Sequence, residues 1–294
     1  MRDIELHEAV MVEEVVNNLI INSSGRYLDC TFGVGGHSRA ILNRLDELGN
    51  LIAFDRDSRS RNKAEILRSK DKRLNFFQTE FSKVGETLET RNLDGLLADL
   101  GISSFQLDDA KRGFSFNQIG SLDMRMNQDS GVTAEDWING ATKKELEDIF
   151  WHLGEDRNSR RIAKRIIITR EKRRITNTKE LSEIILSTSR KRTKRHPATN
   201  IFRAIRMHIN GEIQELKDLL AKSEKVLNIG GRIAIISFHS IEDRLVKRFF
   251  QGKDRQDNSR LKAITKKPIK PTDEEIKKNP RSRSAILRVA EKVC

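Results

Sequence analysis

The sequence predicts an open α/β sheet domain that is interrupted by an all-helical insertion. Through the first hundred residues, short apolar runs alternate with helical patterns, which is typical of βαβ units and a parallel sheet. Strand periodicity is then absent from about residue 108 to residue 207, where the sequence is polar and helix-biased, and it returns at 232–238. We therefore assign residues 1–107 and 208–294 to a discontinuous sheet domain and residues 108–207 to the insertion.

Individual elements follow from local patterns. Strands are expected at 27–32, 51–55, 74–78, 93–100, 232–238 and 285–290, and helices at 38–48, 58–69 and 241–250. A helix should start near Thr133, and a long helix should end at the Gly230-Gly231 pair. Residues 252–284 are rich in proline and lysine and are expected to form a mobile surface excursion.

Composition restricts the function classes. The 294 residues fit one or two domains, and their mean hydropathy is -0.60. The sequence contains no apolar run of about 18 residues, as a membrane span would need, and its start does not have the layout of a signal peptide. Only Cys30 and Cys294 are present, which excludes a disulfide scaffold and a four-thiolate zinc site. We expect a soluble protein of the reducing cytoplasm, with no membrane partner and no metal site.

Positive charge is concentrated in the insertion. Residues 155–207 hold 17 Lys and Arg against five Asp and Glu, so they carry +12 of the net charge of +13. Ile162, Ile166 and Ile167 recur at helical spacing there, which indicates folded amphipathic helices rather than a low-complexity tail. This segment, including the basic run at 190–195, favours a polyanionic partner such as RNA. The alternative is a set of exposed helices whose cations merely face water.

A glycine-rich turn follows the first strand and predicts a nucleotide-type ligand. The sequence Gly33-Val34-Gly35-Gly36-His37 leads into a helix, and Asp55 ends the second strand 22 residues after Gly33. A carboxylate at that place can accept hydrogen bonds from the ribose hydroxyls of an adenosine. The spacing departs from the dinucleotide pattern and Asp29 lies close, so S-adenosylmethionine is favoured over NAD.

The fourth strand delivers Asp99 to the edge where a methyl donor and its acceptor would meet. Methyl transfer depends mostly on alignment of the reacting atoms. For an amine acceptor, Asp99 and Ser103 could accept the amine hydrogens, and Phe105 or Phe114 could stack the base. A second polar cluster, His239-Ser240 with Glu242 and Asp243, follows the strand at 232–238. His239 could contact the substrate, or Ser240 could simply cap the next helix.

Taken in order, the motifs closely resemble the bacterial ribosomal small-subunit RNA (cytosine-N4) methyltransferase family, RsmH or MraW. The resemblance runs from residue 4 nearly to the end of the chain. Its motifs are LHEAVMVEEV, DCTFGVGGHS, FDRD, TEFS, DLGISSFQLD, GFSF, LDMRM, GEDRNSRRIAKRI, HPATNIFRAIRMHINGE, GGRIAIISFHSIEDRLVK and NPRSRSAILRV.

The resemblance implies a class I (Rossmann-like) S-adenosylmethionine methyltransferase sheet with an inserted helical domain. It implies S-adenosylmethionine as donor, 16S rRNA or the small ribosomal subunit as partner, and an N4-methylated cytidine as product. The family's cofactor contacts would fall on Gly35, Gly36, His37, Asp55, Phe81, Asp99 and Gln106, with Phe81 against the adenine. Gly33 would then shape the turn.

Two other function classes stay open at this stage, and so does the possibility of a homodimer. One is an NAD-dependent oxidoreductase built on the same type of sheet. The other is a catalytically idle RNA-binding assembly factor, against which the retained glycine turn, Asp55 and Asp99 argue.

Overall fold

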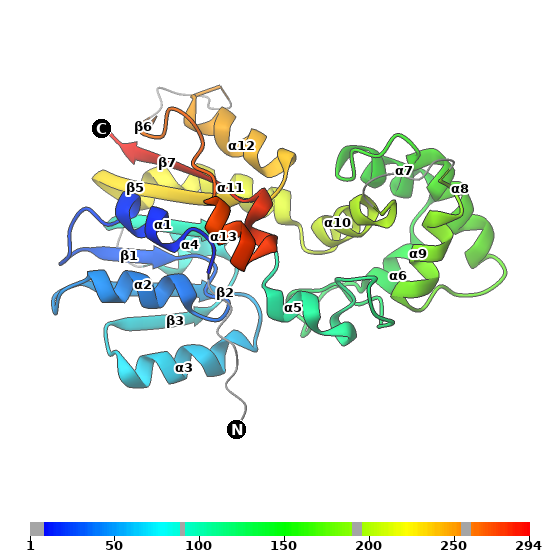
Figure 1. The fold of residues 1–294 in the computed structure, drawn as a ribbon, viewed down its shortest axis with the longest axis horizontal. Coiled ribbons are helices and arrows are strands. Elements are labelled where there is room, and N and C mark those ends of the chain that lie inside the picture. Colours follow the sequence, from blue (N-terminus) through cyan, green and yellow to red (C-terminus); the bar gives the residue numbers. More distant parts are fainter. Residues whose placement is uncertain (1–8, 89–91, 190–195, 254–259) are drawn as a thin grey trace. The chain divides into compact units, whose positions relative to one another are not determined.

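The computed structural model describes residues 9–88, 92–189, 196–253 and 260–294, and the chain divides into two compact units (Figure 1). Unit 1 comprises Met1–Gly101 and Ile213–Cys294, and unit 2 comprises Ile102–Glu212. These junctions lie within six residues of the boundaries that the sequence suggested. Within the described ranges, no helix combines the length and the apolar character that a bilayer crossing requires.

Unit 1 is built on a seven-stranded sheet with the order β3-β2-β1-β4-β5-β7-β6. The first five strands of this order are parallel, whereas β7 is antiparallel to both β5 and β6. The strands are β1 (Arg26–Asp29), β2 (Asn50–Asp55), β3 (Leu74–Gln78), β4 (Leu93–Asp99), β5 (Leu227–Ser237), β6 (Leu261–Ala263) and β7 (Ile286–Lys292). The strand order reverses between β1 and β4, and a parallel sheet binds its ligands beside such a reversal.

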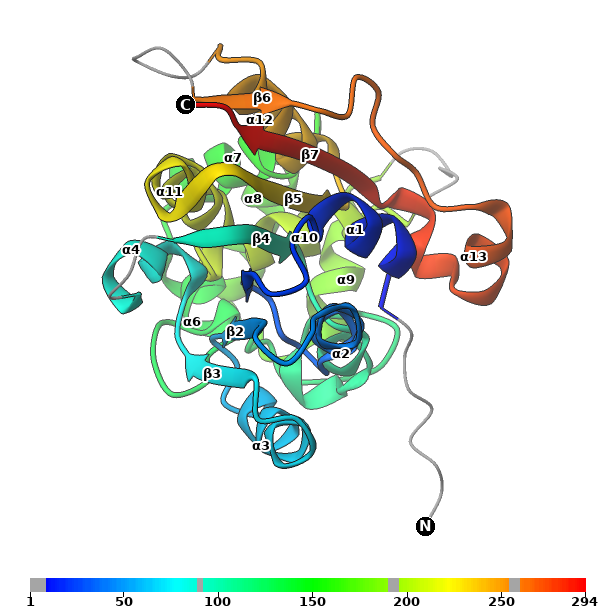
Figure 2. The same cartoon turned by 90° about the vertical axis from the view of Figure 1, so that its left-hand side faces the viewer.

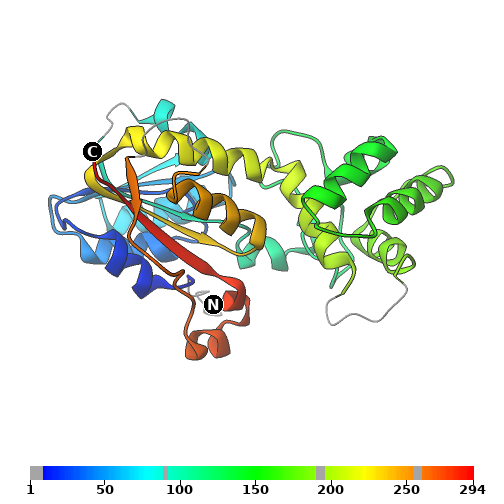
Figure 3. The same ribbon diagram turned by 90° about the horizontal axis from the view of Figure 1, so that it is seen from above.

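Helices cover both faces of this sheet, because its strands are apolar on both sides (Figures 2 and 3). Successive strand residues alternate between two cores: Tyr27 packs in one and Leu28 in the other. The first core lies under α1 (Val12–Leu19), α2 (Gly36–Arg44) and α3 (Ser60–Lys70), and the second under α4 (Val84–Thr87), α11 (Glu212–Val226) and α12 (Ser240–Phe250). Figure 3 shows α11, in yellow, across the strands from α1 and α2, in blue.

The prediction that a helix ends at Gly230-Gly231 is wrong. Helix α11 ends at Val226, and β5 begins at the next residue and runs through both glycines. The pairing of β5 with β4 moves from Leu93↔Leu227 to Gly95↔Arg232, so the glycines form part of a bulge. Gly230 has φ +81, and a Cβ on Gly231 would lie 2.8 Å from the carbonyl oxygen of Leu93. A bulge and a helix stop both require glycine, so the sequence signal was misassigned.

The segment 252–284 is more regular than predicted. It contains β6, the short helix α13 (Asp273–Lys278) and a 3-10 turn at Pro280–Ser284. Glu275 on α13 accepts a hydrogen bond from the backbone N–H of Met11 (2.7 Å), which ties this segment to the start of α1. The described part of this segment therefore has regular elements and a contact with the start of α1, while its mobility stays a prediction of the sequence.

Unit 2 is helical, and no strand occurs among its described residues. Its helices are α5 (Ser104–Asp108), α6 (Ala134–Gly140), α7 (Lys143–His152), α8 (Ser159–Arg170), α9 (Thr178–Leu186) and α10 (Ala198–Ile209). Apolar faces of α6 to α10 share one core, which includes Phe150, Ile166 and Ile205. The predicted helix start at Thr133 is confirmed, because its side chain accepts a hydrogen bond from the N–H of Asp136.

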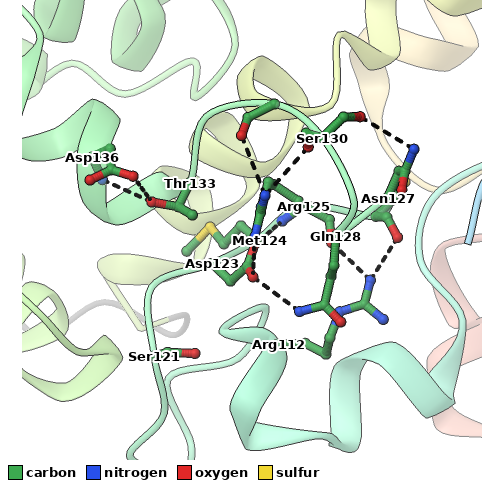
Figure 4. Close-up of polar contacts among 12 residues, drawn as sticks. Arg112, Ser121, Asp123, Met124, Arg125, Asn127, Gln128, Ser130, Thr133 and Asp136 are labelled. Carbon is green, nitrogen blue, oxygen red and sulfur yellow. Dashed lines mark hydrogen bonds and ion pairs between the residues drawn. The ribbon is translucent and has the colours of Figure 1, made fainter.

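A polar network holds the long loop that precedes α6 (Figure 4). Arg112 is almost fully buried and donates to the carbonyl oxygens of Arg125 and Met126, at 2.8 and 2.9 Å. Asp123 accepts two hydrogen bonds from the guanidinium of Arg125 and one from Gln128. Asn210, directly after α10, accepts from the N–H of Met126 and donates to the carbonyl oxygen of Met124, both at 2.7 Å, so the loop is held against the helical part of unit 2.

Candidate active site

The carboxyl ends of the parallel strands gather the predicted site residues of unit 1 at one edge of the sheet. There β1 leads into the glycine turn, β2 ends at Asp55, β4 ends at Asp99, and β5 is followed by His239. Strands β1 and β4 are hydrogen-bonded neighbours, so the glycine turn and Asp99 are adjacent. This edge is where a doubly wound sheet forms its binding crevice.

Glycine is required at specific points of the turn between β1 and α2. Gly33 and Gly35 have positive φ angles of +56 and +79, which side-chain-bearing residues rarely adopt. A Cβ on Gly35 would lie 2.8 Å from the ring of Phe32, and a Cβ on Gly36 would lie 2.7 Å from that of Ala9. The turn is therefore tight and closely covered, and its backbone is the part exposed to a ligand.

Asp55 is already engaged by the protein itself. Its carboxylate accepts hydrogen bonds from the N–H of Gly33 (2.7 Å), the hydroxyl of Ser60 (2.8 Å) and the N–H of Asp57 (2.8 Å). Burial nevertheless raises the pKa of Asp55. A carboxylate has about four acceptor positions, so about one remains open. This leaves room for one ribose hydroxyl rather than the two that the sequence suggested.

Asp99 presents a buried oxygen that the described residues leave without a hydrogen-bond partner, Oδ1. Its other oxygen, Oδ2, lies 3.8 Å from Nδ1 of His37. Burial is the main cause that raises the pKa of Asp99 to about 6; His37 lowers it, and Asp29 and Glu242 raise it further. An unpaired acceptor of this kind is costly in a folded protein, which makes Asp99 a candidate for contact with a ligand that supplies a donor.

The orientation of His37 follows from its second ring nitrogen. Nε2 lies 2.9 Å from the carbonyl oxygen of Val10, which can only accept, so we assign the proton to Nε2. The ring is 5% exposed and is held by the segment that precedes α1. Nδ1 consequently faces Asp99, at 3.8 Å from Oδ2.

Asp29 and Thr31 connect the glycine turn to Asp99. From the sequence, Asp29 served only as an argument against a pyrophosphate, and Thr31 was given no role. Asp29 is fully buried and accepts hydrogen bonds from the hydroxyl of Ser38 (2.6 Å) and the N–H of Thr31 (3.0 Å). The N–H of Asp99 donates to the Thr31 hydroxyl oxygen (2.8 Å). Burial raises the pKa of Asp29. The only sequence signal was an acid two residues before a hydroxyl, which is too common to be specific.

His239 lies on the same edge and acts as the N-cap of α12. Its Nδ1 accepts from the N–H of Glu242 (3.4 Å), so the predicted cap by Ser240 is wrong by one residue. Nε2 lies 3.0 Å from Oε1 of Glu242 but makes no hydrogen bond in that geometry. Glu242 also accepts from the N–H of Phe238, and Asp243 pairs with Arg288 at 2.6 Å. The capping interpretation thus accounts for the cluster's contacts.

The remaining predicted residues lie elsewhere. Phe81 opens a short 3-10 turn after β3, is partly buried, and packs against the second core of unit 1. Ser103 and Gln106 belong to unit 2, where they form a capping box on α5: each side chain accepts from the other residue's backbone N–H, at 3.3 and 3.0 Å. Phe114 is 6% exposed beneath the guanidinium of Arg112 and has little surface on which to stack a base.

The strand order and the acidic, glycine-lined edge are those of a class I, S-adenosylmethionine-dependent methyltransferase. A family model described as the MraW methylase family matches residues 5–293. The chain belongs to this family. That membership selects the methyltransferase interpretation over the NAD-dependent oxidoreductase.

Curated relatives are similar over nearly the whole chain. A protein of Coxiella burnetii named "Ribosomal RNA small subunit methyltransferase H" is 43% identical over 305 residues, covering 98% of this chain and 99% of that protein. A Stenotrophomonas maltophilia protein of the same name is 45% identical over 300 residues, covering 98% of this chain and 93% of that protein. A third, from Nitrosomonas eutropha, is 42% identical over 311 residues, covering 98% of each chain.

Proposed function

We propose that this protein methylates the exocyclic N4 amine of a cytidine in the 16S rRNA of the small ribosomal subunit. The relatives' shared name supports the substrate class. The structural observation that carries the chemistry is the unpartnered Oδ1 of Asp99, next to the glycine turn. This substrate places the enzyme in the cytoplasm. A homodimer stays a prediction of the sequence.

The edge of unit 1 fits a cationic donor. Asp29, Asp99 and Glu242 lie close enough together for the two neighbours to raise the pKa of Asp99, which is unfavourable for a pyrophosphate and favourable for a sulfonium and an ammonium group. When bound, S-adenosylmethionine supplies an electrophilic methyl group. We assign its binding to Gly35, Gly36, His37, Asp55, Phe81, Asp99 and Gln106.

Within this assignment Asp99 has two tasks. One free carboxylate oxygen offers two lone-pair directions, so Oδ1 can face the donor and also accept a hydrogen from the N4 amine. Accepting that hydrogen turns the amine lone pair toward the methyl group, and alignment is the largest contribution a protein makes to such a displacement. Ser103, through its remaining lone pair, and His239, through its Nε2–H, are assigned contacts with the target nucleoside.

Unit 2 supplies the RNA contacts in this proposal. Residues 155–207 carry +12 of the net charge of +13, and the recognition segment in this proposal is residues 108–207. The basic run at 190–195, including Arg190, Lys191, Arg192, Lys194 and Arg195, lies outside the described residues, and its part in binding stays a prediction of the sequence.

The direct test is to map the methylated atom. The purified chain is incubated with labelled S-adenosylmethionine and either 16S rRNA or small subunits from a strain that lacks the enzyme, and the digested RNA is analysed by mass spectrometry. We expect one N4-methylcytidine. Methylation of another atom, or no methylation of either substrate, would contradict the proposal. Calorimetric titration with S-adenosylhomocysteine and with NADH tests the donor class separately, since only the first should bind.

A further inference from the structure

The cations of the basic segment fall into two groups according to their partners. One group is held by the protein: Arg173 pairs with Glu180, Arg174 with Glu135 and Asp136, Lys179 with Glu183, and Arg206 with Glu212, while Arg170 and Arg203 donate to backbone carbonyls. These residues lie at the end of α8, in the segment that joins it to α9, on α9 and on α10. Their charges stabilise unit 2 internally.

The second group consists of Arg157, Arg160, Arg161, Lys164 and Arg165, which we call the α8 cation face. All five side chains belong to exposed residues, and none has an acidic or carbonyl partner within the described part of the chain. Arg157 lies in the loop before α8, and the other four residues lie on the first two turns of this helix. Lys172, also exposed and unpartnered, lies beyond the end of the helix.

The helix geometry makes these cations one surface. At about 100° per residue, Arg160, Arg161, Lys164 and Arg165 span an arc of roughly 140° on α8. Ile162, Ala163 and Ile166 point the opposite way and are buried in the core of unit 2. The apolar face of α8 is covered, and within the cation arc only Ile168 is apolar and it is partly buried, so the helix offers too little apolar surface to insert into a lipid surface.

The chemistry of this face fits phosphate. Four of its five members are arginines, whose planar guanidinium groups bind phosphate oxygens through two hydrogen bonds. No aromatic side chain is interleaved among them, so the face offers no platform on which to stack a base. From Arg160 to Arg165 the helix rises about 7.5 Å, a length comparable to about two to three phosphates of one strand.

We infer that the α8 cation face binds the phosphate backbone of the rRNA substrate, independently of base sequence, and positions the RNA without taking part in methyl transfer. This inference rests on the proposed function and identifies the element of unit 2 that makes the phosphate contact. Phosphate contacts release counterions, so each adds about -0.7 to -0.9 to the slope of log affinity against log salt.

The test compares two variants with the same loss of charge. The first, R160Q/R161Q/K164Q/R165Q, removes four cations of the α8 face. The second, K143Q/K144Q/R173Q/R174Q, removes four cations of unit 2 that are paired with Glu147, Asp148, Glu180, Glu135 and Asp136. Glutamine keeps helix propensity, and thermal melts verify folding. Affinity for transcribed 16S rRNA is measured between about 50 and 300 mM KCl.

For the α8 variant we expect a slope that is smaller by about 2 and affinity roughly 10- to 100-fold weaker at 0.1 M salt. The KM for RNA should increase, whereas kcat and the affinity for the methyl donor should not change. The paired variant should keep the wild-type slope. An unchanged slope in the α8 variant would overturn the inference and would suggest that this face binds an acidic protein instead. An equal loss of RNA affinity in both variants would also overturn it, because the effect would then come from net charge alone. If the wild type produced no N4-methylcytidine while the slopes still differed, the proposed function would fail and the phosphate face would stand.

Discussion

The two units leave opposite charges uncompensated. At the edge of the sheet in unit 1, Asp29, Asp99 and Glu242 are gathered with His37 as the close basic neighbour, and Oδ1 of Asp99 has no partner among the described residues. On unit 2, the α8 cation face is exposed, and none of its cations is paired within the described residues. Folding alone favours neither arrangement. Each becomes favourable with a ligand of opposite charge: a cationic methyl donor in one unit and a polyanion in the other.

The largest effect expected from this comparison is the loss of turnover in Asp99→Asn. Asparagine keeps the size of the side chain but removes the negative charge that orients the amine. A preorganised group of this kind is typically worth about 100- to 1,000-fold in rate. Single-turnover methylation of rRNA at saturating donor measures the effect. Turnover close to that of the wild type under those conditions would show that Asp99 does not orient the amine.

Asp55→Asn should mainly weaken donor binding. A hydrogen bond to a charged group contributes about 1.5–3 kcal/mol, so we expect the Kd for S-adenosylhomocysteine to rise roughly 10- to 100-fold. Calorimetry measures this, with rRNA affinity as the control that should not change. Weakened RNA binding with intact donor binding would reverse the assignment of the two ligands to the two units.

The acidic edge also predicts a pH dependence. Only the ionised form of Asp99 offers both oxygens as acceptors and carries the negative charge, and burial raises its pKa to about 6. The rate of methyl transfer should therefore increase with pH up to a plateau above about 7, with a decrease of about tenfold at pH 5. The residual activity of Asp99→Asn should not show this increase with pH. A wild-type profile that is flat between pH 5 and 8 would contradict the ionised role of Asp99.

Stability should change in the opposite direction to activity at this position. A raised pKa in the folded state means that stability is fully present below the unfolded pKa of about 4 and is lost as pH rises through about 6. The Asp99 side chain is 24% exposed, so the cost at neutral pH is at most about 3 kcal/mol. Asp99→Asn should be more stable than the wild type at pH 7.5, with the difference decreasing toward pH 4.

Asp55 provides the control for this stability prediction. Three internal donors bind its carboxylate, so Asp55→Asn should leave one of them unpaired and destabilise unit 1. Denaturant titration of both variants at pH 7.5 measures the contrast. If both substitutions lowered the free energy of unfolding equally, the unpartnered oxygen of Asp99 would have no effect on stability.

The 22-residue spacing assigned the glycine turn and Asp55 to one ligand site, and the structure brings Gly33 and Asp55 into hydrogen-bond contact. Binding of a ribose by Asp55 stays a prediction of the sequence. Sequence reasoning missed Thr31 and the link from Asp29 through Thr31 to Asp99, because this link depends on the register of β1 against β4. It misassigned Gly230-Gly231 because a bulge and a helix stop give the same glycine signal. It chose Ser240 over His239 because serine is the commoner cap.

The smallest effect should come from the cations of unit 2 that already have partners. Arg174 is about half exposed and contacts Glu135 and Asp136 at 2.7 and 2.6 Å. Exposed ion pairs contribute little, since the water that they displace solvates both charges nearly as well. Arg174→Gln should therefore lower the Tm only slightly, with less effect at high salt, and leave the salt dependence of RNA binding unchanged. A change in RNA affinity comparable to that of an α8 cation would mean that pairing does not separate structural from binding cations, and the contrast within the basic segment would be lost.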